Sequence, residues 1–251
     1  MVTDTRKNEG ENSRTIFAVG YPKSGSTWLA RLLGELTGSP VLGYYRRRKG
    51  TLKDLSVDGL HKAETSREVI YKSHGRIESV LKDASPEDVV VVIRDPRDVV
   101  VSAFHYCYRM KYQRTNAVSC LDEIIRQMAS GRFFIKAVQE ASWRDHTTGW
   151  LESEALCVRY EDLLDEPKCV CEEILAHLGI GREESQILRA IEKKSFEREK
   201  ADLDGRGKFR GQGFMHEGKS GQYVGFLSPS QQKAVIASFG DVMKKLGYQI
   251  D

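Results

Sequence analysis

Residues 20–27, which read GYPKSGST, form a glycine-bounded turn that carries hydroxyl side chains and one lysine. The spacing of the two glycines is that of a Walker A loop, but Ser26 stands where that loop has its lysine, and Lys23 lies earlier. Backbone N–H groups of such a turn can bind an anion, and the hydroxyls of Ser24, Ser26 and Thr27 would add donors. The pattern predicts a phosphate-binding loop; the alternative is a tight turn without a ligand.

Two other side chains that could do chemistry follow apolar runs. Arg94 comes directly after the run VVVVI, and an arginine there can form a bidentate pair with a phosphate. A structural ion pair with Asp95 or Asp98 would equally explain its position. His74 ends a second run and could act as a general base, or serve only as a structural histidine. Ligands of parallel α/β sheets bind beyond the carboxyl ends of the strands, which is where both residues are expected to lie.

The elements that carry these residues alternate between strand and helix patterns. We predict strands at 15–20, 67–74, 88–93 and 154–160, and helices after the glycine turn, from about 95, between about 120 and 150, and near 167–179, 183–193 and 228–248. This alternation predicts a single α/β domain over residues 15–251, with a mainly parallel sheet flanked by helices and a P-loop-like strand-loop-helix. Residues 1–14 are expected to form a flexible tail, and 202–225 a long closing loop.

The helix after Arg94 has a recognisable start. Asp95 is expected as its N-cap and Pro96 suits its first position, because proline there loses no helical hydrogen bond. Asp98 lies three residues after the expected cap, so we predict that it completes a capping box.

Composition excludes several classes of protein. The chain has 251 residues with 39 Lys and Arg against 36 Asp and Glu, a formal net charge of +3 that does not indicate a nucleic-acid partner. Five cysteines without a CxxC pair indicate reduced thiols rather than a disulfide framework or a zinc site. No run of about 20 apolar residues predicts a membrane span, and the first residues lack a signal-peptide core. We therefore expect a cytoplasmic protein.

Taken together, the motifs resemble those of the PAPS-dependent sulfotransferases of the cytosolic type, and of a bacterial member in particular. YPKSGSTW at 21–28 is similar to the family's 5′-phosphosulfate loop, KSH at 72–74 to its catalytic segment, and RDPRDVVVS at 94–102 to its 3′-phosphate segment. RYED at 159–162 and KSFE at 194–197 resemble the segments that line the adenine.

The resemblance implies a role for each matching residue. Lys23 would bridge the phosphosulfate and the leaving oxygen, His74 would take the acceptor proton, and Lys72 would stabilise the transferring group. Ser102 is assigned both to this catalytic group and to the cofactor site. The cofactor would be held by Lys23, Ser24, Gly25, Ser26 and Thr27 at the 5′-phosphosulfate, by Arg94 and Ser102 at the 3′-phosphate, and by Trp28, Tyr160, Ser195 and Phe196 around the adenine. By position alone, Trp28 could instead be a core residue.

The implied activity is transfer of a sulfuryl group from PAPS, as co-substrate, to a hydroxyl or amine of a small-molecule acceptor. Sulfuryl carries less negative charge than phosphoryl, so lysines and loop amides could suffice and no metal would be required. Two other functions stay open. A P-loop small-molecule kinase shares the strand-loop-helix, although Ser26 replaces its lysine; a non-catalytic nucleotide-binding module is possible, although Lys23 and His74 argue against it.

Residues 216–223, HEGKSGQY, depart from the family pattern. The family's arginine-lysine-glycine run, which closes over the 3′-phosphate, has lost both cations here. We predict that the loop still closes, with Lys219 as the replacement cation and the backbone N–H of Gly218 as a further donor. The family's usual dimerisation motif is also absent, so a homodimer is possible but would need another interface.

Overall fold

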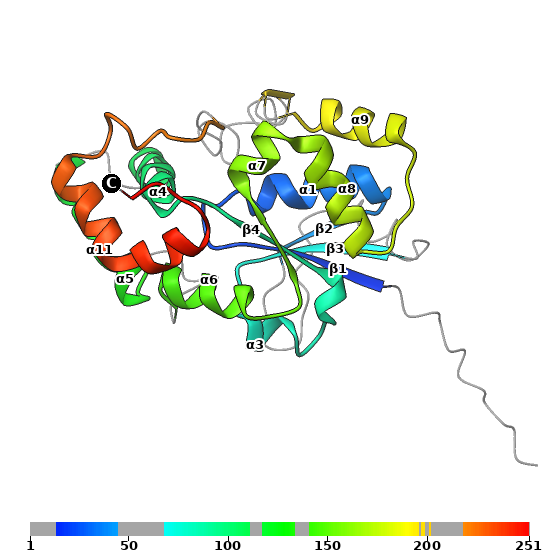
Figure 1. The fold of residues 1–251 in the computed structure, drawn as a ribbon, viewed down its shortest axis with the longest axis horizontal. Coiled ribbons are helices and arrows are strands. Elements are labelled where there is room, and N and C mark those ends of the chain that lie inside the picture. Colours follow the sequence, from blue (N-terminus) through cyan, green and yellow to red (C-terminus); the bar gives the residue numbers. More distant parts are fainter. Residues whose placement is uncertain are drawn as a thin grey trace, which may run out of the picture.

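A five-stranded sheet with parallel pairing throughout lies at the centre of the protein (Figure 1). Its order is β2 (Val41–Tyr44), β3 (Glu68–Ser73), β1 (Arg14–Val19), β4 (Val89–Ile93) and β5 (Leu156–Arg159). The computed structural model describes residues 14–44, 68–110, 117–133, 141–195, 197–198, 201 and 218–250. The predicted α/β domain with a mainly parallel sheet is confirmed over these residues. Most of the expected tail, and Phe196, lie outside them.

Strand β4 supplies side chains to two separate cores. All its residues are buried, and they alternate between the faces of the sheet. Val89, Val91 and Ile93 belong to one apolar cluster, while Val90 and Val92 belong to the other. A run of β-branched residues without polar alternation is typical of a parallel strand covered on both faces, so this part of the sequence predicted its strand well.

Helices cover both faces of the sheet (Figure 1). One core is built with α1 (Ser26–Thr37), α7 (Tyr160–Asp165), α8 (Pro167–His177) and α9 (Glu184–Lys193). The other is built with α3 (Ile77–Val80), α4 (Pro96–Met110), α5 (Ala117–Ser130), α6 (Trp143–Leu151) and α11 (Pro229–Lys245). A 3₁₀ turn at Pro86–Asp88 precedes β4. The helix predicted between about 120 and 150 is therefore two helices, because Gly131 leaves α5 with a left-handed φ of 71°.

The start of α4 is capped in part as predicted. A carboxylate oxygen of Asp95 accepts the backbone N–H of Arg97 at 2.8 Å, which confirms the N-cap. The predicted capping box is wrong. The backbone N–H of Asp95 donates to Glu161 Oε1 at 3.1 Å, and Asp98 instead accepts backbone N–H groups from residues after 218. Contacts between distant parts of the chain have replaced the local pair.

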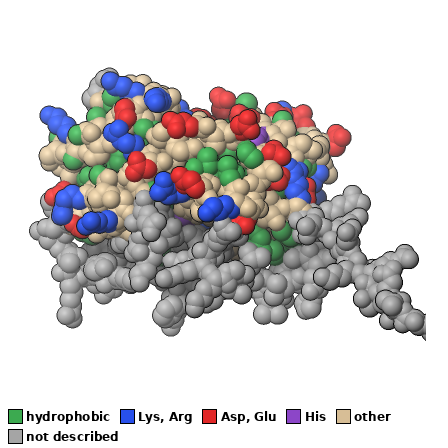
Figure 2. Space-filling view, turned by 90° about the horizontal axis from the view of Figure 1, so that it is seen from below, with side chains coloured by type: hydrophobic (Ala, Val, Ile, Leu, Met, Phe, Trp, Pro, Cys, Tyr) green, Lys and Arg blue, Asp and Glu red, His purple; other side chains and the backbone are tan. Residues whose placement is uncertain are grey.

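Charged side chains of both signs share the described surface that is seen in Figure 2. There, Lys and Arg side chains are interspersed with Asp and Glu over the described residues. Over those same ranges, the helices are too short or too polar to cross a bilayer. Four cysteines are described with their side chains, and all are free thiols: Cys120, Cys157, Cys169 and Cys171.

Candidate functional site

The glycine turn predicted to bind an anion connects the central strand β1 to α1. Lys23 has a left-handed φ of 74°, and Gly25, the N-cap of α1, has a φ of 102°. A non-glycine residue in this region is strained, and such strain is concentrated at functional sites. Because glycine has no capping side chain, the first N–H groups of α1 are left for another acceptor. The side-chain oxygen of Ser24 is buried and lacks a hydrogen-bond partner within the described chain.

Aromatic side chains pack directly against this turn. A Cβ added to Gly25 would lie 2.6 Å from the ring of Tyr160, so only glycine fits there. The same ring lies 4.4 Å from the Arg94 guanidinium, in cation–π geometry, and meets Trp28 edge to face at 5.5 Å between centroids. Trp28 is nearly buried in a core cluster, and its indole N–H donates to the carbonyl of Lys194 at 2.6 Å. Of the residues predicted around the adenine, Trp28 and Tyr160 therefore lie together on one side of the loop.

Ser195 follows Lys194 and is half-buried, which places it beside the carbonyl that Trp28 contacts. Ser102 is half-buried on α4, four residues beyond Asp98 and hence on the same helix face. Ser102 thus lies on the helix that follows Arg94, and Ser195 lies in the segment after α9. The structure gives no direct contact from either to the glycine turn among the described residues.

Lys72 and His74 reach the same edge from β3, the neighbour of β1. Lys72 Nζ donates to Thr27 Oγ1 at 2.7 Å, and burial together with the positive charge of Arg31 lowers the pKa of Lys72 to about 8. His74 Nδ1 lies 2.5 Å from the carbonyl oxygen of Gly20. Since a carbonyl only accepts, Nδ1 must donate, and in the neutral ring Nε2 is the proton acceptor.

Burial, then the charge of Lys72, lowers the pKa of His74 well below its usual value. The imidazole is therefore neutral at physiological pH. A neutral ring with an accepting Nε2 can take a proton from a ligand hydroxyl.

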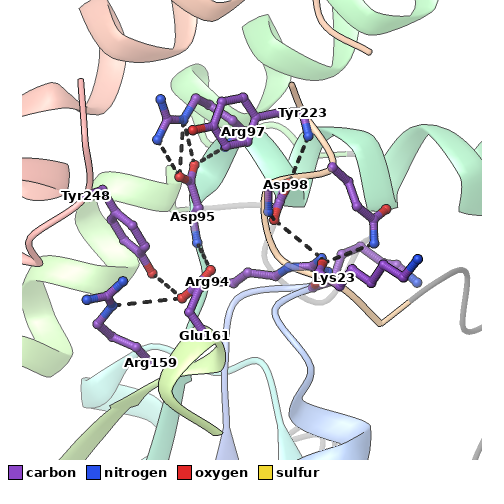
Figure 3. A network of polar contacts seen from close by, with 12 residues as sticks. Lys23, Arg94, Asp95, Arg97, Asp98, Arg159, Glu161, Tyr223 and Tyr248 are labelled. Atoms are coloured by element: carbon purple, nitrogen blue, oxygen red, sulfur yellow. Dashed lines mark hydrogen bonds and ion pairs between the residues drawn. The ribbon is translucent and has the colours of Figure 1, made fainter. Parts of the chain in front are cut away.

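Arg94, at the carboxyl end of β4, joins the glycine turn to the segment that follows residue 217 (Figure 3). Its guanidinium donates to the carbonyl oxygens of Lys219 at 2.9 Å and Lys23 at 3.5 Å, and lies 3.7 Å from an Asp98 carboxylate oxygen. The ion-pair alternative is thus realised with Asp98, whereas Asp95 pairs with Arg97 at 2.6 Å. Arg94 Nε is buried without a partner among the described residues, so the guanidinium retains one free donor.

Several contributing residues were missed by sequence reasoning. Glu161 accepts the Asp95 N–H with one carboxylate oxygen and the Tyr248 hydroxyl, at 2.9 Å, with the other (Figure 3). The RYED motif identified the segment but not this role, and no local pattern marks Tyr248. Asp98 was predicted as a capping residue and as a possible ion-pair partner of Arg94, but not as an acceptor for backbone N–H groups after residue 218. In the described ranges, no cluster of three or more His, Cys, Asp or Glu side chains could hold a metal ion.

The fold is that of an α/β protein in which a helix N-terminus follows the central strand beside lysine and arginine side chains, an arrangement that can bind an anion. A family model described as "Sulfotransferase domain" matches residues 13–247, and the chain belongs to this family. It is similar to human sulfotransferase 2A1, with 26% identity over 194 residues, and to human sulfotransferase 2B1, with 28% over 182 residues. These matches cover 72% and 67% of this chain, but only 65% and 47% of the relatives.

Solved structures of two proteins show the same fold. Mouse sulfotransferase SULT7A1, solved in complex with PAP, has a TM-score of 0.69 and 20% identity, with 92% of this chain and 84% of that chain covered. Retinol dehydratase, in complex with retinol and PAP, has a TM-score of 0.66 and 19% identity over 93% and 83% of the two chains.

We predict that Gly25→Ala destabilises the protein by about 2–4 kcal/mol, since it adds a left-handed alanine and a Cβ that overlaps the Tyr160 ring. Gly38→Ala is the matched control, because Gly38 has a similar left-handed φ of 73° but no atom within 4 Å of an added Cβ. The free energy of unfolding of each variant is measured in urea, and the difference between the two losses gives the cost of the overlap with Tyr160. Equal losses of stability would contradict the close packing of Tyr160 on the loop.

Proposed function

We propose that residues 15–251 form a PAPS-dependent sulfotransferase domain that transfers a sulfuryl group to a hydroxyl or amine of a small-molecule acceptor. The supporting observation is that the carboxyl edge of the sheet joins an anion-binding turn, a neutral histidine and a buried arginine. PAP, present in the structures named above, carries phosphates at its 5′ and 3′ positions. The turn and Arg94 offer one site for each.

The residues present fit such a nucleotide. The uncapped N-terminus of α1 and the hydroxyls of residues 24–27 are assigned to the 5′-phosphate, where the unpartnered Ser24 Oγ would gain a bond. The 3′-phosphate is assigned to Arg94, whose Nε has a free donor, with Ser102, Gly218 and Lys219. The adenine is assigned to the edge framed by Trp28, Tyr160, Ser195 and Phe196.

PAPS supplies the sulfuryl group, whose bond to the bridging oxygen of the phosphosulfate breaks as a bond to the acceptor oxygen or nitrogen forms. His74 Nε2 receives the proton that the acceptor loses. Lys23, held at the turn, and Lys72, held by Thr27, place positive charge where negative charge develops on the leaving group. These fixed cations perform the task that Mg²⁺ performs in kinases, so the proposed reaction uses no divalent metal.

One contact favours sulfuryl transfer over a P-loop kinase. A kinase of that type needs an acid after the strand to hold Mg²⁺, and Asp95 is the residue in that position. Both carboxylate oxygens of Asp95 accept from the Arg97 guanidinium, and one also caps α4. This carboxylate is therefore occupied by structural contacts.

Removing either reactive side chain should impair chemistry more than folding. We predict that Lys23→Ala and His74→Ala keep a melting temperature near that of the wild type while turnover falls about 100-fold or more. Turnover is followed by mass spectrometry of sulfonated product from isotope-labelled PAPS, in excess EDTA. His177→Ala is the control, because His177 also bonds to a backbone carbonyl, at 3.2 Å, but lies on α8. Unchanged turnover in His74→Ala would exclude it as the base, and a strict need for Mg²⁺ and ATP would favour a kinase.

The pH dependence of kcat/KM should have two limbs. His74 must be neutral to accept a proton, and its lowered pKa puts the acidic limb below pH 6.5. Lys72 must be charged, and its pKa of about 8 puts the alkaline limb there. Lys72→Arg should move only the alkaline limb, to above about pH 9, because a guanidinium stays charged. An alkaline limb that remains near pH 8 in this variant would contradict the assignment.

The replacement cation can be tested by titration calorimetry with PAP and with 5′-AMP, which lacks the 3′-phosphate. We predict that Arg94→Ala abolishes the preference for PAP and that Lys219→Ala reduces it about 5- to 20-fold. The Lys219 side chain is exposed, so its charge can reach a bound phosphate without a burial cost. Lys233→Ala, an exposed lysine on α11, is the control. A preference that is intact in Lys219→Ala would leave Arg94 and backbone N–H groups as the site.

A further inference from the structure

Asp98 carries contacts that neither helix capping nor the residue assignments above explain. Its side chain is completely buried. One carboxylate oxygen accepts the backbone N–H of Gly221 at 2.8 Å, and the other accepts the N–H of Tyr223 at 3.0 Å (Figure 3). A buried carboxylate that accepts backbone N–H groups forms strong, charge-assisted hydrogen bonds. Asp98 therefore anchors residues 218–223, which we call the closing segment, to the first turn of α4.

Two neighbouring contacts hold the same segment. The carbonyl of Lys219 accepts from Arg94 at 2.9 Å, and the Arg97 guanidinium lies 3.9 Å from the centre of the Tyr223 ring. Arg97 is itself fixed by Asp95. The closing segment is thus attached through its backbone and one aromatic ring, all to residues that follow β4.

The charge of Asp98 opposes the role assigned to its neighbour. Its carboxylate lies 3.7 Å from Arg94, and a negative charge there weakens the attraction of Arg94 for a phosphate. Burial of the carboxylate carries a desolvation penalty as well. The ion pair with Arg94 and the two backbone hydrogen bonds offset the desolvation of the carboxylate, and only the hydrogen bonds tie it to the closing segment.

We propose that Asp98 is a positioning residue that holds the closing segment on Arg94 and thereby makes the site select nucleotides with a 3′-phosphate. The proposal rests on the proposed function, because it assigns the 3′-phosphate to Arg94. With the segment already docked, a ligand need not order it on binding, so its free energy of binding is not reduced by that ordering. Asp98 acts through the segment and does not contact the phosphate.

The test combines two measurements on wild type, Asp98→Ala and Asp98→Asn. Hydrogen exchange of the Gly221 and Tyr223 amides reports whether the segment is held. Calorimetric titration with PAP and 5′-AMP reports selectivity. Asn keeps the shape and one acceptor of Asp98, so it remains informative where Ala impairs folding. Val170→Ala, a core change on α8 in the opposite cluster, is the control for a general loss of stability.

We expect both amides to exchange at least about tenfold faster in Asp98→Ala and the PAP preference to fall at least about tenfold, with 5′-AMP affinity changed less than about threefold. Asp98→Asn should show smaller changes in the same direction. If Asp98 acted by charge alone, both variants would bind PAP more tightly, and that result would overturn the proposal. A wild type that does not distinguish PAP from 5′-AMP would contradict the proposed function itself, whereas a wild-type preference that persists in both variants would exclude only the role of Asp98.

Discussion

The burial of charge directly after β4 is the constraint that shapes this site. Arg94, Asp95, Arg97 and Asp98 are each at most 5% exposed. An unpaired charge in such a place is strongly destabilising, so every one of these groups must find partners. Asp95 and Arg97 pair with each other, while Arg94 and Asp98 find partners in the glycine turn and the closing segment. The glycine turn and the closing segment therefore meet at the charges that follow the carboxyl end of the strand.

Glu161 extends this network to the last part of the chain. Its carboxylate bridges the Asp95 N–H and the Tyr248 hydroxyl, and Arg159 lies 4.6 Å from the Tyr248 ring centre. Burial raises the pKa of Glu161, which is the cost of placing a carboxylate there. The segment after α11 is therefore tied through Glu161 to the backbone of Asp95, the residue that follows Arg94.

Sequence reasoning was most successful where one local signal decides the structure. The run of valines in β4 and the Asp95 cap were identified because apolar pattern and cap chemistry act over a few residues. The strand β2 was missed because VLGY is short and contains a glycine, which weakens the strand pattern. The anchoring role of Asp98 could not be predicted. Its carboxylate was expected to accept a nearby N–H group at the start of α4, whereas the N–H groups that it accepts lie more than a hundred residues away. The sequence thus identified the important residues better than it identified the groups that they contact.

The contacts of the closing segment join residues that lie far apart in the sequence, which affects the order in which the protein folds. The bonds from Asp98 to Gly221 and from Arg94 to Lys219 join residues 123 and 125 positions apart. Closing a loop of that size costs conformational entropy before its contacts form, so such contacts form slowly. The strands β1, β3 and β4 pair within a shorter stretch of chain. The sheet can therefore form before its charged edge is completed. During synthesis, Arg94 and Asp98 lack their partners in the closing segment until residues 218–223 have emerged, so docking of this segment is expected among the last events of folding.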